Sequence, residues 1–210
     1  MSLLEVQHLQ IEYPSRHGVM VAVKDLSLSV TAGEIVGIVG ESGAGKSTIG
    51  NAVIDLLSPP GVIAKGDVFL NGQKISGLTR EQMRDVRGSK IGFIFQDPMT
   101  SLNSLFTIEQ QMVETVLANQ DVTREDAYQR AIDMLTAVGI PNPELRIKQY
   151  PHQFAGGMRQ RVVIAIALIC DPDLIIADEP TTALDVSIQD QILQLIKTLC
   201  KERQVGCMLV

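Results

Sequence analysis

Apolar residues occur in two patterns along the chain, as short runs between turn-forming residues and as longer stretches with a helical period. The short runs predict strands at positions 3–11, 19–30, 35–39, 66–70, 91–95, 174–177 and 205–210. The helical spacing predicts helices within 108–138, after 156–157 and from 187 to 199. Because strands alternate with helices and several strands are apolar throughout, the pattern predicts an α/β fold with parallel strands at the centre of its sheet.

Composition and charge restrict the class of protein. The chain has 210 residues, of which 45% are hydrophobic, and its formal net charge is −6; these values predict one folded domain with no nucleic-acid partner. The longest apolar run, 162–170, has nine residues, whereas a bilayer-spanning helix needs about 20. No secretory signal is visible at the N-terminus, so we expect a cytoplasmic protein. The three cysteines and three histidines lack metal-ligand spacing, and we expect the cysteines to be buried.

A phosphate-binding motif directly follows the apolar run 35–39. It matches G-x-x-x-x-G-K-[ST] between a predicted strand and a helix. Small residues let successive backbone N–H groups turn toward an anion, a lysine reaches the terminal phosphates, and a serine hydroxyl can ligate Mg²⁺. The motif therefore predicts a nucleoside triphosphate site whose contacts are Gly40, Glu41, Ser42, Gly43, Ala44, Gly45, Lys46, Ser47 and Thr48.

Two adjacent carboxylates, Asp178 and Glu179, end the apolar strand predicted at 174–177. Ligands of open α/β sheets bind beyond the carboxyl ends of the strands, so both acids lie where a ligand is expected. Asp178 can hold Mg²⁺ through water, and Glu179 can orient or deprotonate an attacking water. A strand end with solvated acids is the alternative for this pair considered alone. Together with the phosphate motif, the pair favours phosphoryl transfer to water.

In this order the motifs resemble those of the ATP-binding subunit of an ABC transporter, over nearly the whole chain. Residues 95–98 are similar to the family's Q-loop, 155–161 to its signature sequence, and 178–185 to the Walker B end and D-loop. Within the family, the segments that look most like the dipeptide, oligopeptide and nickel importers of bacteria are 99–103, 150–153 and 157–161. Two alternatives stay open, a soluble ABC-type ATPase not tied to transport and a nucleotide-sensing module that does not hydrolyse.

The resemblance implies a fold, ligands and roles for particular residues. The implied fold is a P-loop NTPase core with a mostly parallel central sheet, an antiparallel β subdomain and a helical insertion, divided at 1–96, 97–170 and 171–210. ATP and Mg²⁺ are the implied ligands. Beyond the phosphate motif, nucleotide contacts are implied for Tyr13, which would stack on adenine, and for Ala155, Gly156, Gly157 and Asp185. Catalytic roles are implied for Lys46, Gln96 and Glu179, and metal contacts for Ser47, Gln96 and Asp178.

The resemblance also implies partners. Two ATPase subunits of such proteins, identical or different, face each other head to tail, so that Gly156 and Gly157 of one complete the ATP site of the other. The helical insertion would dock on one of two membrane permease subunits, which in turn receive solute from a solute-binding protein. We therefore expect a chain on the inner face of the cell membrane that powers solute import, with dipeptides and oligopeptides as the solutes.

Two positions and the end of the chain depart from the family pattern. Ala155 stands where the signature normally has serine, which removes a hydrogen bond worth about 1.5–3 kcal/mol and predicts a heterodimer with one weakened site. Ser104 stands where the branch often has proline. The family carries a switch histidine beyond the strand that here ends at Val210, so we expect a truncated chain that binds ATP·Mg²⁺ more strongly than it turns over.

Overall fold

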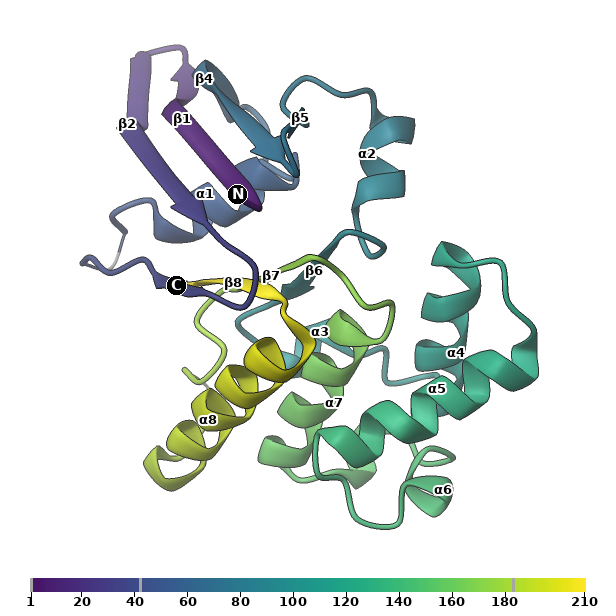
Figure 1. Ribbon diagram of the computed structural model, residues 1–210. Coiled ribbons are helices and arrows are strands. Elements are labelled where there is room, and N and C mark those ends of the chain that lie inside the picture. The colour runs from purple at the N-terminus through teal and green to yellow at the C-terminus, as the bar shows by residue number, and fades with distance from the viewer. Residues whose placement is uncertain (1, 42, 183) are drawn as a thin grey trace.

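The computed structural model of the protein describes residues 2–41, 43–182 and 184–210 (Figure 1). The described residues form two four-stranded sheets. The antiparallel sheet has the order β2-β1-β4-β5, with β1 (Leu4–Ser15), β2 (Gly18–Val30), β4 (Val62–Leu70) and β5 (Gln73–Lys74). The parallel sheet has the order β3-β8-β7-β6, with β3 (Ile35–Gly37), β8 (Gly206–Leu209), β7 (Leu174–Ala177) and β6 (Ile91–Ile94).

Helix α1 (Lys46–Val53) packs between the two sheets. Its buried side chains join one apolar cluster with the inner faces of β1 and β4 and with Ile176 and Met208 of the parallel sheet. A Cβ atom at Gly50 would lie 3.0 Å from Cγ2 of Ile176, so glycine lets the helix approach the parallel sheet closely. This packing fixes the helix that follows the phosphate motif against both sheets.

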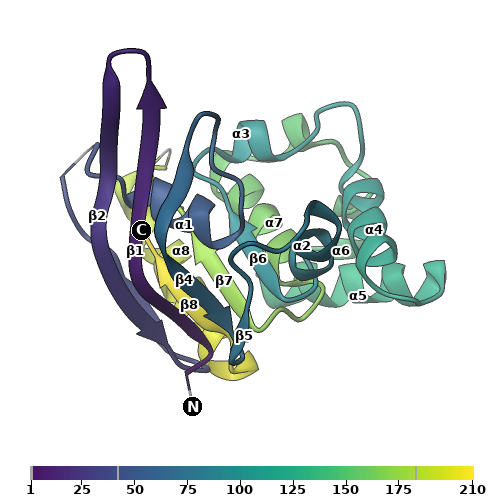
Figure 2. The ribbon, with the colours of Figure 1, turned by 90° about the horizontal axis from the view of Figure 1, so that it is seen from above.

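All the other described helices except α2 (Arg80–Val86), whose Met83 belongs to the same cluster as α1, cover the opposite face of the parallel sheet and extend away from it, as Figure 2 shows. They are α3 (Pro98–Ser101), α4 (Ile108–Asn119), α5 (Arg124–Ala137), α6 (Pro143–Arg146), a 3₁₀ turn (Pro151–Gln153), α7 (Gly156–Leu168) and α8 (Val186–Arg203). Helix α7 lies directly on β6, because a Cβ atom at Gly92 would clash with the carbonyl oxygen of Ala167. Among the described helices none is both long and apolar enough to cross a bilayer.

Most predicted elements are confirmed, with corrections at their ends. The stretch 108–138 is two helices, because the chain is extended at Gln120 before Thr123 caps α5 by accepting the amide of Asp126. The strand predicted at 35–39 ends at Gly37, and Val39 is 93% exposed, because the chain turns there into the phosphate motif. The short elements β5, α2 (Arg80–Val86), α3 and α6 were not predicted.

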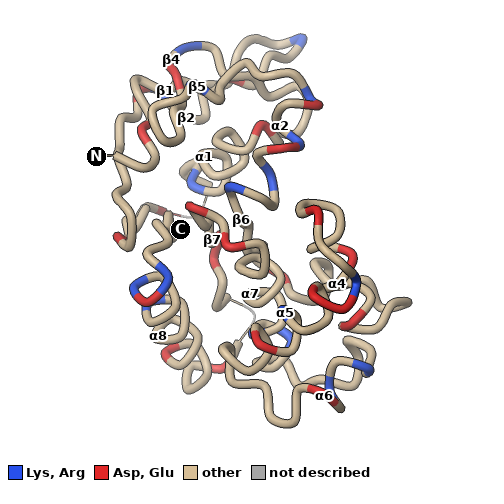
Figure 3. The backbone as a smooth tube through the Cα atoms, turned by 45° about the vertical axis from the view of Figure 1, so that its right-hand side comes forward, with Lys and Arg blue, Asp and Glu red and all other residues tan. Residues whose placement is uncertain are grey.

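Charges of both signs are distributed over the sheets and the helical layer, rather than gathered on one face (Figure 3). All three cysteines are buried, as predicted. Burial raises the pKa of the Cys170 thiol to about 11, so the group stays protonated at neutral pH.

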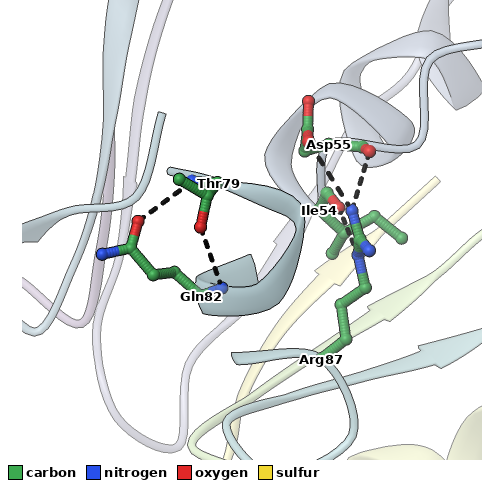
Figure 4. Close-up of polar contacts among 5 residues, drawn as sticks. All are labelled: Ile54, Asp55, Thr79, Gln82 and Arg87. Atoms are coloured by element: carbon green, nitrogen blue, oxygen red, sulfur yellow. Dashed lines mark hydrogen bonds and ion pairs between the residues drawn. The ribbon is translucent and has the colours of Figure 1, made fainter. Parts of the chain in front are cut away.

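The C-terminal end of α1 is held by Arg87, which precedes β6 (Figure 4). Its Nε donates to the carbonyl oxygen of Ile54 at 2.7 Å, and its Nη2 donates to that of Asp55 at 2.8 Å. A cation is favourable at the last carbonyl groups of a helix, which carry partial negative charge. This contact ties the end of α1 to the segment before β6. Lys46 lies at the other end of α1, and Gln96 follows the other end of β6.

Candidate nucleotide-binding site

The loop that carries the phosphate motif depends on glycine. Gly43 and Gly45 both have a φ of +81°, a left-handed conformation that other residues rarely adopt. A Cβ atom at Gly45 would also lie 2.7 Å from the carbonyl oxygen of Ala22 in β2. Gly45 is the N-cap of α1 and supplies no side chain to the first amides of the helix, so these amides can be offered to an anion. Ser42, a predicted contact, lies outside the described residues.

The ammonium group of Lys46 lies against the same loop. Its Nζ donates to the carbonyl oxygens of Gly40 at 2.9 Å and Glu41 at 2.8 Å. Phosphate oxygens are stronger acceptors than neutral carbonyl oxygens, because their hydrogen bonds to an ammonium group are charge-assisted on both sides. Lys46 is therefore placed to exchange these bonds for a phosphate. Ala44 lies in the loop, where its amide donates to Glu41, and Thr48 lies in the first turn of α1.

A serine and a carboxylate meet where α1 faces the end of β7. Ser47 Oγ donates to Oδ1 of Asp178 at 2.8 Å, and Asp178 is 9% exposed. Burial raises the pKa of Asp178, and the charge of Glu179 adds to this effect, while the Ser47 hydroxyl and Lys46 oppose it. A divalent cation would offset the cost of burying this carboxylate, and hydroxyl and carboxylate oxygens are the ligands that Mg²⁺ prefers. The donor set fits the predicted ion.

Glu179 and Gln96 are brought together by the pairing of β6 with β7. Ile94 pairs with Ala177, and Gln96 and Glu179 each follow two residues later. Gln96 Nε2 donates to Oε2 of Glu179 at 2.9 Å. Glu179 has a φ of +45°, a strained conformation for a residue with a side chain, which is common at functional sites.

A further residue joins this contact and was missed by the sequence analysis. Thr182 Oγ1 donates to the same oxygen, Oε2 of Glu179, at 3.0 Å. Its backbone amide also donates to the carbonyl oxygen of Glu179 at 3.3 Å. The only signal in the sequence is a hydroxyl three residues after the acid, which becomes informative once the turn is known.

Tyr13, the predicted adenine contact, lies near the end of β1 and is half-buried. A Cβ atom at Gly61 would lie 2.7 Å from Cε1 of its ring, so the ring packs against the loop between α1 and β4. Contact between Tyr13 and adenine stays a prediction.

The predicted signature residues lie together at the start of α7. Ala155 is the N-cap and makes no side-chain cap hydrogen bond, and the helix begins at Gly156. A Cβ atom at Gly157 would lie 2.9 Å from Cγ2 of Ile188 in α8. Asp185, the N-cap of α8, lines the same hollow as these residues. Ala183, within the predicted D-loop, lies outside the described residues.

The sequence and the fold are both similar to those of known proteins. OppD of Bacillus subtilis, an oligopeptide transport ATP-binding protein, is 47% identical over 201 residues, which cover 95% of this chain and 56% of that relative. DppD of Escherichia coli, a dipeptide transport ATP-binding protein, is 44% identical over 210 residues, which cover 100% of this chain and 64% of the relative. The chain thus spans roughly three fifths of the length of these curated relatives.

Among solved structures, the dimeric ATP-binding cassette MJ0796, in a post-hydrolysis state bound to ADP and Pi, superposes with a TM-score of 0.84. It is 30% identical in sequence, and the match covers 99% of this chain and 87% of the other. This likeness confirms the predicted fold class. A family model described as ABC transporter matches residues 23–182, so the chain belongs to the ABC transporter family.

Proposed function

We propose that this chain binds ATP with Mg²⁺ and hydrolyses it, as the ATP-binding subunit of a bacterial importer of dipeptides or oligopeptides. One observation carries the proposal. Two hydrogen bonds lie at the carboxyl ends of β6 and β7, next to the phosphate motif. One joins Ser47 to Asp178, and the other joins Gln96 to Glu179. The similarity to OppD and DppD, which are oligopeptide and dipeptide transport ATP-binding proteins, supports the substrate class.

Each residue of this group has a chemical task in the proposed reaction. The amides at the start of α1 and the ammonium group of Lys46 bind the phosphates. Ser47 and Asp178 would hold Mg²⁺, which neutralises charge on the phosphates during transfer. Glu179 orients and deprotonates the water that attacks the terminal phosphate. Gln96 holds one oxygen of that carboxylate.

A second subunit completes the proposed site. The start of α7 at Ala155, Gly156 and Gly157, with Asp185 beside it, would meet nucleotide bound by the partner's phosphate motif. The similar structure of MJ0796, which is a dimer bound to ADP and Pi, supports this arrangement. The helical segment 97–170 would dock on the membrane permeases, and Tyr13 would contact adenine.

The test is phosphate release by the full-length protein assembled with its membrane subunits. Glu179→Gln keeps the shape of the side chain and removes the base, so turnover should fall by about 10²–10⁴-fold, while the affinity for ATP stays within about twofold. Glu202→Gln changes an exposed glutamate at the end of α8 and should leave both unchanged. Absence of ATP-dependent phosphate release by the wild type would contradict the proposal.

A further inference from the structure

One oxygen of the Glu179 carboxylate receives two hydrogen bonds. Gln96 Nε2 lies 2.9 Å and Thr182 Oγ1 lies 3.0 Å from Oε2. Two donors that approach the same oxygen from different segments fix both the position and the rotation of the carboxylate. They leave Oε1 as the oxygen that can accept a hydrogen from water.

The two donors are not equivalent. Gln96 reaches Glu179 from the end of a neighbouring strand, so its bond depends on how β6 and β7 lie relative to each other. Thr182 belongs to the same turn as the glutamate, and this turn is closed by the backbone bond from the amide of Thr182 to the carbonyl oxygen of Glu179. The threonine bond therefore does not depend on the relative position of β6 and β7.

The turn fixes the backbone of Glu179, and the hydroxyl of Thr182 within that turn restrains its side chain. A glutamate at a φ of +45° lies in a region that costs free energy, and its half-buried side chain has three torsions to fix. A hydroxyl within the turn limits these torsions without a contribution from any other segment. In-line attack on a phosphate requires such orientation, because small misplacement of a reacting group lowers the rate strongly.

We propose that Thr182 is a positioning residue whose hydroxyl holds Oε2 of Glu179, so that Oε1 faces the attacking water. This proposal rests on the proposed function, in which Glu179 is the base for ATP hydrolysis. In this role Thr182 acts through Glu179, to which its hydroxyl donates.

Three variants of the full-length protein in its membrane complex separate positioning from a structural role. Thr182→Val removes the hydroxyl and keeps the shape, Thr182→Ser keeps the hydroxyl, and Thr181→Val makes the same change at the neighbouring half-buried threonine. Thr182→Val should lower kcat about tenfold to a hundredfold, with KM for ATP and nucleotide affinity within about twofold. Thr182→Ser should restore most of kcat, and Thr181→Val should retain it.

A second measurement on nucleotide-free protein does not depend on turnover. Glutamate labelled with ¹³C at the carboxyl carbon gives one NMR signal per residue, and the Glu179 signal is the one lost in Glu179→Gln. At fixed pH this signal should shift in Thr182→Val and stay in place in Thr182→Ser and Thr181→Val.

An unchanged kcat in Thr182→Val, or an unmoved Glu179 signal, would overturn the role of Thr182 alone. Equal losses in kcat and nucleotide affinity would also overturn it, because they indicate a merely structural role. If the wild type itself releases no phosphate, the proposed function fails as well.

Discussion

The phosphate motif and the start of α7 differ in whether their polar groups have hydrogen-bond partners within the chain. At the phosphate motif and the ends of β6 and β7, functional groups pair with one another: Lys46 with loop carbonyl groups, Ser47 with Asp178, and Gln96 with Glu179. At the start of α7, the N-cap is Ala155 and makes no side-chain hydrogen bond. The first region holds its groups in place before any ligand arrives, whereas the second offers helix amides to something outside the helix.

The difference affects which hydrogen bonds must change when each region binds a ligand. Ligand binding at the phosphate motif must exchange internal hydrogen bonds for new ones, so the net gain depends on charge-assisted bonds to phosphate. In the proposed function, the amides at the start of α7 would instead receive a phosphate that another subunit presents. Within one chain, the first region pairs its functional groups internally, and the second has no side-chain cap at its N-terminus.

The largest expected effect breaks the first region. Lys46→Met removes the ammonium group and keeps most of the apolar stem, so two or more charge-assisted bonds to phosphate are lost, each worth about 1.5–3 kcal/mol. The Kd for ATP, measured by fluorescence titration of a labelled analogue, should rise at least about 100-fold. Lys65→Met, at an exposed lysine of β4, is the matched control. Comparable affinity in Lys46→Met and wild type would show that the motif does not bind phosphate.

The next effect concerns the scaffold behind this region. Arg87→Met removes both hydrogen bonds to the end of α1 and should lower the free energy of unfolding by about 2–3 kcal/mol, measured by urea denaturation. Arg84→Met, at an exposed arginine of α2, should change it by less than about 0.5 kcal/mol. Equal stability of the two variants would contradict the stabilising role of the two Arg87 hydrogen bonds.

Lys46 and Arg87 also show which residues can be found from the sequence and which cannot. Lys46, Ser47 and Asp178 were found from motifs whose strand and helix context can be recognised locally. The fold then brings Ser47 and Asp178, which lie 131 positions apart in the sequence, into contact.

Arg87 was missed because its partners lie 32 and 33 positions away and no motif surrounds it. Thr182 was missed because its contact depends on the left-handed backbone of Glu179. A capping box at Thr79 was readable in the sequence and would have located α2.

A smaller effect sharpens the contrast at the start of α7. Ala155→Ser adds a hydroxyl at an N-cap with extended backbone, where serine accepts an amide of the first turn, so the nucleotide-free protein should gain about 1 kcal/mol of stability. Ala137→Ser, at the exposed end of α5, should lose a few tenths of a kcal/mol. No gain from Ala155→Ser in urea denaturation would mean that the amides of α7 already have partners.

The smallest effect concerns pH. Because burial raises the pKa of Asp178 above its ordinary value of 3.8, the folded state retains a proton that the unfolded state has already lost. Stability from this group therefore falls as pH rises from 3.8 through the raised pKa. Asp178→Asn should remove that fall and stabilise the nucleotide-free protein at neutral pH, as thermal unfolding at several pH values would reveal. A variant less stable than wild type at neutral pH would contradict this sign.

The central claim is that residues 40–48 and the ends of β6 and β7 form a site for the polyphosphate of ATP with Mg²⁺. Isothermal titration calorimetry of the full-length protein with Mg²⁺·ATP, and with AMP as the ligand that lacks the outer phosphates, tests it most directly. The account predicts saturable binding of one ATP per chain and at least about 100-fold weaker binding of AMP. No saturable heat with ATP, or equal affinity for both nucleotides, would contradict it.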